Sequence, residues 1–137
     1  FSQPEMSEGY ILDGWGRKMS NVELYNPGFD AVVFLNISDE TVIKRISGRR
    51  VCPVDGHNFN VYTNPPKNPD ICDFCGGPLE IGADDTEEIA KSRLEIFKSQ
   101  TYPVIEWFRD DGRLIEINAE PPIPEVVDAV FEKLNLL

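Results

Sequence analysis

The sequence predicts an α/β protein built on a parallel sheet and interrupted by a small inserted lobe. Strand-like runs of apolar and β-branched residues alternate along the chain with helix-like segments, the order typical of a parallel sheet covered by helices. This alternation stops between residue 48 and about residue 83, where Gly, Pro, Asn and Cys dominate and no helical period survives. The 137 residues, 41% of them apolar, are enough to bury the core of one ordinary domain.

Four elements are expected before the lobe. The apolar run at 10–14 predicts a short buried strand that places Asp13 at its C-terminal end. A brief helix follows and is closed by the Asn-Pro-Gly sequence at 26–28. The continuous β-branched and aromatic run at 30–37 predicts a strand covered on both faces, and Ser38 is expected to cap the helix that comes next.

Beyond the lobe the sequence predicts a helix, a strand and a final helix. The first helix begins at the acidic residues after position 83 and is broken or kinked by Pro103. Its apolar face is expected to consist of Ile89, Leu94, Ile96 and Phe97. Residues 112–119 alternate as a strand does. The last helix carries apolar residues at core-helix spacing, namely Val126, Val127, Val130, Phe131 and Leu134. The expected division is a core at 1–47, the lobe at 48–83 and a second part of the core at 84–137.

The charge balance excludes several classes of partner. With 24 acidic and 13 basic side chains the formal charge is -11, and such a surface is repelled by nucleic acids and anionic membranes. Any bound phosphate must therefore be met by a local group of arginines. The sequence contains no apolar run long enough to cross a membrane and no signal-like segment, and its three cysteines suit a reducing compartment. We expect a cytoplasmic location.

The cysteines predict a metal site in the lobe, which we call the cysteine lobe (residues 48–83). Cys52 and Asp55 are separated by two residues, and after a further sixteen come Cys72 and Cys75 with the same spacing. Zinc takes four ligands in a tetrahedron, and two tight turns that each present two side chains supply them. A site with no open position is structural. Two alternatives stay open at this point: His57 in place of Asp55, or three free cysteines in a loop.

The few basic residues are grouped: Arg45, Arg49 and Arg50 flank the junction into the cysteine lobe, Arg93 lies on the helix that leaves it, and Arg17 follows the C-terminal end of the first expected strand. Guanidinium groups bind phosphate oxygens bidentately, so this grouping favours a phosphate site. The alternative is that these arginines form ion pairs with the many carboxylates around them. The pair Asp84 and Asp85, where the lobe rejoins the core, either orients metal-bound water or begins a helix.

Four stretches together resemble one protein family. GYILDGWGR, KRISGRRVC, the two cysteine-containing turns and ADDTEEIAKSRLEIFKSQTYPVIEWF resemble adenylate kinases of the zinc-bearing, long-lid type, in order and spacing, from about Gly9 to the C-terminus. The resemblance implies a P-loop kinase-type parallel sheet with the cysteine lobe as a zinc-bound lid. It further implies structural zinc, magnesium bound with ATP, the substrates ATP and AMP, a monomer, and no nucleic-acid or membrane partner.

The resemblance also implies roles for single residues. The residues with implied catalytic roles are Arg17, which binds phosphate, Arg49, which reaches the phosphates from the lid, and Arg93, which spans both substrates. Those with implied substrate-binding roles are Asp13 near the magnesium, Asn21 near the AMP base, Arg45 against the ATP base, and the pair Asp84 and Asp85. The implied zinc ligands are Cys52, Asp55, Cys72 and Cys75, with Asp55 as the fourth.

The sequence departs from the family at several points. These 137 residues contain no G-x-x-x-x-G-K-[ST] phosphate loop and no monophosphate-binding segment after it. Gly16 replaces a proline, Gly82 an arginine, and Asn21 a glutamine of the family pattern. We therefore expect an ATP:AMP phosphotransferase only as part of a longer chain with an N-terminal P-loop segment, and no activity from this chain alone. The alternative is a non-catalytic, zinc-stabilised module that binds nucleotide or a partner.

Overall fold

The computed structural model of the chain describes residues 9–135. In chain order its elements are α1 (Met19–Leu24), β1 (Val32–Asn36), α2 (Asp39–Ser47), β2 (Arg49–Val51), β3 (Asn58–Asn60), α3 (Glu87–Ile96), the π-helical turn η2 (Phe97–Thr101), α4 (Tyr102–Asp110), β4 (Leu114–Asn118) and α5 (Ile123–Leu134). None of the helices between residues 9 and 135 is long and apolar enough to cross a membrane.

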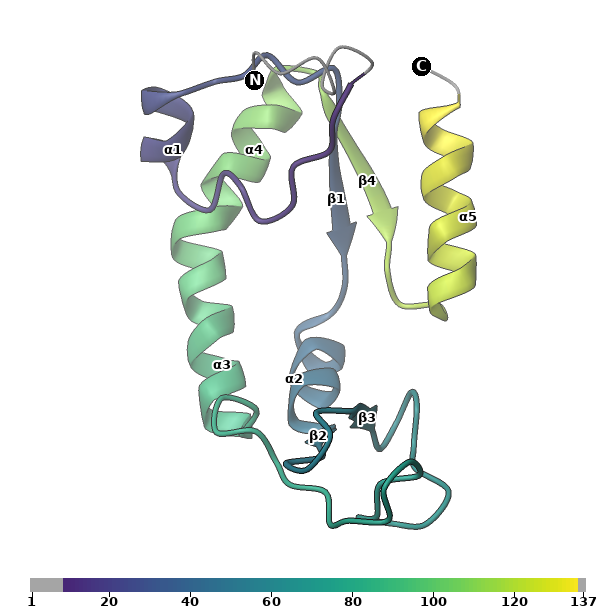
Figure 1. Ribbon diagram of the computed structural model, residues 1–137. Helices are drawn as coiled ribbons and strands as arrows, with labels where there is room; N and C mark the ends of the chain where they lie inside the picture. The colour runs from purple at the N-terminus through teal and green to yellow at the C-terminus, as the bar shows by residue number, and fades with distance from the viewer. Residues whose placement is uncertain (1–8, 136–137) are drawn as a thin grey trace.

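A parallel pair of strands forms the centre of the fold. β1 and β4 pair in parallel, from Val32 opposite Leu114 to Asn36 opposite Asn118. The chain between them passes through α2, the cysteine lobe and the rod formed by α3 and α4, while α5 packs beside β4 (Figure 1). The parallel pairing and the alternation of strands with helices confirm the expected α/β class. The core on the α4 side contains Val22, Val104 and Phe108.

Local capping signals place the ends of two helices. The Ser38 hydroxyl accepts a hydrogen bond from the Thr41 N–H, which confirms the expected cap of α2. Thr86 caps α3 in the same way. Pro103 does not end the helix: it lies in the first turn of α4, where a missing N–H costs little, and the irregularity is taken up by the π-helical turn before it.

The expected strand at 10–14 is wrong. This segment is irregular, and the side chain of Ile11 is 94% exposed. A strand needs a hydrogen-bonded neighbour, and among residues 9–135 no strand pairs with this segment. The expected burial of β1 on both faces is also wrong, because Val33 and Leu35 are 36% and 49% exposed. Ile96, expected on the apolar face of its helix, is exposed as well.

The final helix forms where expected, but its apolar face is not buried. No residue of α5 is fully buried, and Phe131 is 61% exposed. The physical reason is that, among residues 9–135, β4 is the only strand or helix against which α5 makes extensive contact, so these residues leave one side of the helix uncovered. The spacing of the apolar residues therefore predicted the helix correctly, but the expectation that these residues form a buried core face is wrong.

The cysteine lobe has its own small core. β2 and β3 pair antiparallel, with Arg50 opposite Phe59, and an isolated bridge joins Val51 to Glu80. Its buried apolar residues are Cys52, Phe59, Cys72 and Leu79. The division of the chain at residues 47 and 83 stays a prediction.

Candidate functional site

The first cysteine-containing turn, residues 52–57, is closed by backbone hydrogen bonds. The Cys52 N–H donates to the His57 carbonyl at 2.9 Å, and the Gly56 N–H donates to the Cys52 carbonyl at 2.9 Å. Gly56 has φ +74°, a conformation that favours glycine. The His57 N–H then donates to Asp55 Oδ1 at 3.0 Å, so the backbone holds the carboxylate in place.

The second turn, residues 72–77, repeats this geometry. The Cys72 N–H donates to the Gly77 carbonyl at 2.8 Å, and the Gly76 N–H donates to the Cys72 carbonyl at 2.9 Å. Gly76 has φ +72°, close to the value of its counterpart in the first turn. The Gly77 N–H donates to Cys75 Sγ at 3.4 Å. Asp55 thus occupies in its turn the position that Cys75 occupies here.

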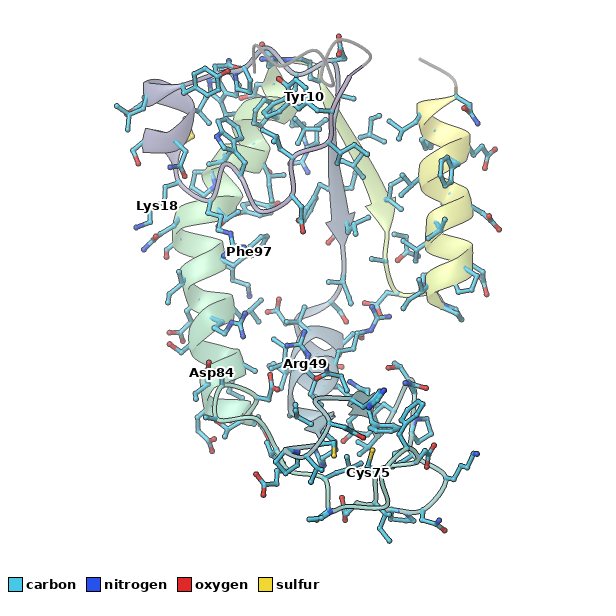
Figure 2. All side chains as sticks on the ribbon, viewed as in Figure 1. Tyr10, Lys18, Arg49, Cys75, Asp84 and Phe97 are labelled. Atoms are coloured by element: carbon cyan, nitrogen blue, oxygen red, sulfur yellow. The ribbon has the colours of Figure 1, made fainter. Side chains whose placement is uncertain are left out.

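The two turns bring four possible ligands together. One atom each of Cys52, Asp55, Cys72 and Cys75 lies within 4.8 Å of the others. Cys52 Sγ is 3.4 Å from Cys75 Sγ, and Cys72 Sγ is 3.3 Å from Asp55 Oδ2. Ligand atoms about 2.0–2.3 Å from a tetrahedral ion lie about 3.3–3.8 Å from one another, so these separations suit such an ion. Cys75 is labelled in the lobe in Figure 2.

The electrostatics of the group also favour a cation. The thiol of Cys52, the His57 N–H and other donors hold the pKa of the Asp55 carboxyl well below its usual range. The Gly77 N–H favours the Cys75 thiolate, but the neighbouring Cys52 and desolvation outweigh it and raise the pKa of Cys75 to about 12. Several thiolates beside a carboxylate repel one another, and a bound divalent ion removes that repulsion.

His57 lies beside this group but is not one of its four members. Its Nδ1 is 3.0 Å from Asp55 Oδ1, and its ring stacks on Phe74 with 3.8 Å between the ring centroids. The imidazole therefore contacts the Asp55 carboxylate from outside the group of four possible ligand atoms. The geometry therefore favours Asp55 over His57 as the fourth ligand.

Two of the arginines near the lobe are in contact with carboxylates. Arg49 Nη1 lies 3.4 Å from Oδ1 of Asp85, which is only 8% exposed. Arg50 Nε lies 3.7 Å from Asp70 Oδ1, and Arg50 Nη1 also donates to the carbonyls of Ser47 and Arg49. These contacts agree with the alternative in which Arg49 and Arg50 form ion pairs with nearby carboxylates. Arg49 is the first residue of β2, and its side chain is labelled beside α2 in Figure 2.

Asp84 and Asp85, where the lobe rejoins the core, differ in burial. Asp84 is exposed near the N-terminal end of α3 (Figure 2), whereas Asp85 is buried. A Cβ atom at Gly82 would lie 2.6 Å from Asp85 Oδ2. Glycine at this position is therefore what allows the buried carboxylate to sit where it meets Arg49.

Two cavities open at the carboxyl ends of the parallel strands. One, of about 630 Å³, is lined by Asn36 and Ile37 at the end of β1 and by Arg93 and Lys98 from the rod. The other, of about 370 Å³, lies between Arg45 and α5, and its lining is mostly apolar: Leu35, Ala119, Pro121, Ile123, Val126, Val127, Val130 and Phe131. We call the second cavity the α5 groove.

The remaining candidates lie near α1. Arg17 Nε donates to the Gly14 carbonyl at 3.1 Å, and Asn21 Oδ1 accepts from the Lys18 N–H at 3.0 Å as part of the cap of α1. Asp13 is exposed in the irregular segment before α1. None of these three belongs to the four-ligand group or lines either cavity.

Sequence reasoning missed two residues that tie α2 to the rest of the chain. Lys98 forms an ion pair with Asp39 in the first turn of α2. Glu120, two residues after the end of β4, accepts hydrogen bonds from the start of α2. Both contacts join residues far apart in sequence, and no local spacing indicates them.

Comparison with known proteins places these features in one family. The family model described as "Adenylate kinase, active site lid" matches residues 49–84. An adenylate kinase of Streptomyces avermitilis is 39% identical over 97% of this chain and 64% of its own length, and one of Methanocella arvoryzae is 37% identical over 97% and 66%. One of Halobacterium salinarum is 38% identical over 88% and 56%. The chain thus spans between 56% and 66% of the length of these curated relatives.

Proposed function

The chain belongs to the adenylate kinase family, and from this premise we propose that it carries the lid, the adenine site and the phosphate-binding arginines of an ATP:AMP phosphotransferase. The observation that supports this most directly is the place of the two cavities. The larger cavity includes residues at the carboxyl end of β1 and the α5 groove includes residues just after β4, where α/β sheets bind ligands, and each is lined by one arginine, Arg93 or Arg45.

In this proposal the ATP base occupies the α5 groove and packs on the Arg45 guanidinium. The phosphates extend toward the 630 Å³ cavity, where Arg93 and Lys98 face them. The carboxylates Asp13, Asp84 and Asp85 would face the water ligands of magnesium, which as part of the MgATP substrate would neutralise phosphate charge. Little covalent work falls to the protein, because phosphoryl transfer depends on alignment and charge stabilisation.

Movement of the cysteine lobe supplies the other part of the mechanism. Arg49 leaves Asp85 as the lobe closes and reaches the phosphates, which also excludes water from the transfer. Arg17 binds phosphate from the α1 side, and Asn21 meets the acceptor base. Cys52, Asp55, Cys72 and Cys75 would hold zinc, and its role would be structural, because three thiolates and a carboxylate would leave no open position for a substrate.

Catalysis on this proposal needs a phosphate loop that these 137 residues do not contain. Oriented amides and a lysine hold the transferred phosphate in P-loop kinases, and each such preorganised donor contributes on the order of 10²-fold in rate. Among residues 9–135, β1 pairs only with β4, so its second edge is open to a strand from another segment. We propose that this strand leads into the phosphate loop.

An assay of ADP formation tests the proposal. With MgATP and AMP the 137-residue chain alone should show no turnover, and the same chain joined to a P-loop segment from a relative should be active. In the joined protein Arg93→Ala should lower turnover more than it weakens ATP binding, because its charge acts mainly on the transferring group. Robust metal-dependent turnover by the chain alone would contradict the need for the loop.

A non-catalytic, zinc-stabilised binding module is the second candidate, and Gly82 is the observation that favours it. The family pattern has an arginine there, and its loss removes one phosphate-binding charge. If the joined protein binds ATP but transfers no phosphate, this second function is the better one. In both cases we propose a cytoplasmic monomer, which sedimentation and thiol-state measurements in cells would check.

A further inference from the structure

Glu120 joins two parts of the fold that are far apart in sequence. It lies in the connection between β4 and α5, and its Oε1 accepts a hydrogen bond from the Ser38 N–H at 2.6 Å. Its Oε2 accepts from the Thr41 hydroxyl at 2.8 Å. Its backbone carbonyl accepts from Arg45 Nη2 at 3.0 Å. One residue therefore meets α2 at three points.

These three points lie on one face of α2. Positions 38, 41 and 45 are spaced by three and four residues, so they follow one another along a single helical stripe. Contacts about two turns apart on one stripe fix the rotation of a helix about its own axis as well as its position. The Asp39–Lys98 ion pair holds the start of α2 from the other side. The rotation of α2 in turn decides where the Arg45 side chain points.

The α5 groove depends on this rotation, because its two walls come from the two parts that Glu120 joins. Arg45 of α2 forms one wall, and Pro121 with α5 forms the other. Glu120 immediately precedes Pro121, so it belongs to one wall and hydrogen-bonds to the other. A loss of its side-chain bonds would leave α2 packed on α3 and paired through Asp39 with Lys98, but no longer tied by side-chain bonds to the connection between β4 and α5.

We propose that Glu120 is a positioning residue that holds Arg45 against the α5 groove and so sets the affinity for the adenine base. This proposal rests on the proposed function, in which the groove takes that base. The carboxylate is suited to the task at neutral pH, because the Ser38 N–H, the Ser38 hydroxyl and the Thr41 hydroxyl lower the pKa of Glu120 below its usual range. It acts through Arg45 and does not touch the base.

ATP binding to the 137-residue chain tests the proposal. NMR signals of the Val126 and Val130 methyl groups, which line the groove, report the base, and inorganic tripolyphosphate distinguishes the base from the phosphates. We expect Glu120→Ala and Arg45→Ala each to raise the Kd of ATP about fivefold, the scale of one lost contact between a guanidinium and an aromatic ring. Glu132→Ala is the matched control, because it removes an exposed carboxylate from α5 outside the groove.

The double variant separates positioning from simple destabilisation. If Glu120 acts through Arg45, then Glu120→Ala combined with Arg45→Ala binds ATP no more weakly than Arg45→Ala alone. Glu120→Gln, which keeps an acceptor for the Ser38 N–H, should stay within about twofold of the wild type. The proposal would be overturned if the effects of the two substitutions on the Kd of ATP multiplied in the double variant. It would also be overturned if Glu120→Ala left that Kd unchanged.

Two further outcomes are distinguishable. If Glu120→Ala fails to fold, Thr41→Val is the alternative, because it removes only one of the two hydrogen bonds to the Glu120 side chain. The effect of Thr41→Val on the Kd of ATP must also disappear when it is combined with Arg45→Ala. If ATP leaves the groove methyl signals of the wild type unchanged, or if tripolyphosphate shifts them equally, the assignment of the groove to adenine fails. That result would overturn the proposed function and this inference together.

Discussion

The cysteine lobe and the two-stranded core differ in how they are completed. The lobe has a buried centre of its own, with Cys52 and Cys72 each 1% exposed, and its four polar ligands face one another. The core leaves α5 without a single buried residue and exposes Leu35 on β1. A small metal site can organise a segment that lacks apolar content, whereas a parallel sheet depends on neighbours on both edges and both faces.

Removing the metal should have the largest effect and should separate the two regions. Chelation, or Cys75→Ser, is expected to unfold residues 48–83 and to leave the α/β core folded, because Phe59 and Leu79 are the lobe's only buried apolar side chains besides Cys52 and Cys72. Amide hydrogen exchange measures both regions in one experiment. Equal loss of protection in the lobe and in α4 would show that the two regions are one cooperative unit. Elemental analysis should find one zinc per chain.

The reverse experiment truncates the core. Phe108 is 2% exposed and packs with Val22 and Val104, so Phe108→Ala should lower the free energy of unfolding by about 3–5 kcal/mol. Urea titration followed by tryptophan fluorescence measures it, and the zinc content should not change. Phe131→Ala is the control: this side chain is 61% exposed, and its loss should cost less than about 1 kcal/mol. Release of zinc from folded Phe108→Ala would contradict the separation.

Within the lobe, substitutions at Asp55 and His57 distinguish the fourth ligand from its neighbour. Asp55→Ala should lower zinc affinity strongly, because it removes a ligand. His57→Ala should lower it by about 10–100-fold or less, because the ring only contacts the carboxylate that would bind the ion. Competition with a chromogenic chelator measures both affinities. The assignment is wrong if His57→Ala abolishes binding while Asp55→Ala retains it.

The smallest effect concerns pH and belongs to the core. The Ser38 N–H and the two hydroxyls lower the pKa of Glu120 in the folded chain, so its ionised form contributes stability above the unfolded value of about 4.3. That contribution is lost as the pH falls through the lower, folded pKa. The stability difference between the wild type and Glu120→Gln should therefore shrink as the pH falls from 6 toward 3. A constant difference would show that the charge of Glu120 contributes nothing.

Local signals were readable in the sequence, and long-range ones were not. Ser38 and the pair spacing at Cys72 and Cys75 act within a few residues, so the cap of α2 and the ligand group followed from spacing. The segment at 10–14 has strand-like composition, but strand formation depends on a partner that residues 9–135 do not provide. Glu120 meets Ser38 across 82 positions, and no period connects them. The exposed face of α5 likewise depends on what else packs nearby.

The matching backbones of residues 52–57 and 72–77 would make the proposed fourth ligand exchangeable. In each turn the N–H two positions later donates to the side chain at the third position after the first cysteine: the His57 N–H to Asp55 Oδ1, and the Gly77 N–H to Cys75 Sγ. Aspartate and cysteine each bring one negative charge to a divalent ion, so replacing one with the other alters neither the turn nor the charge of the site. Position 55 can therefore drift in evolution between a hard oxygen and a soft sulfur, and the lobe can change its metal preference while inheriting its shape intact.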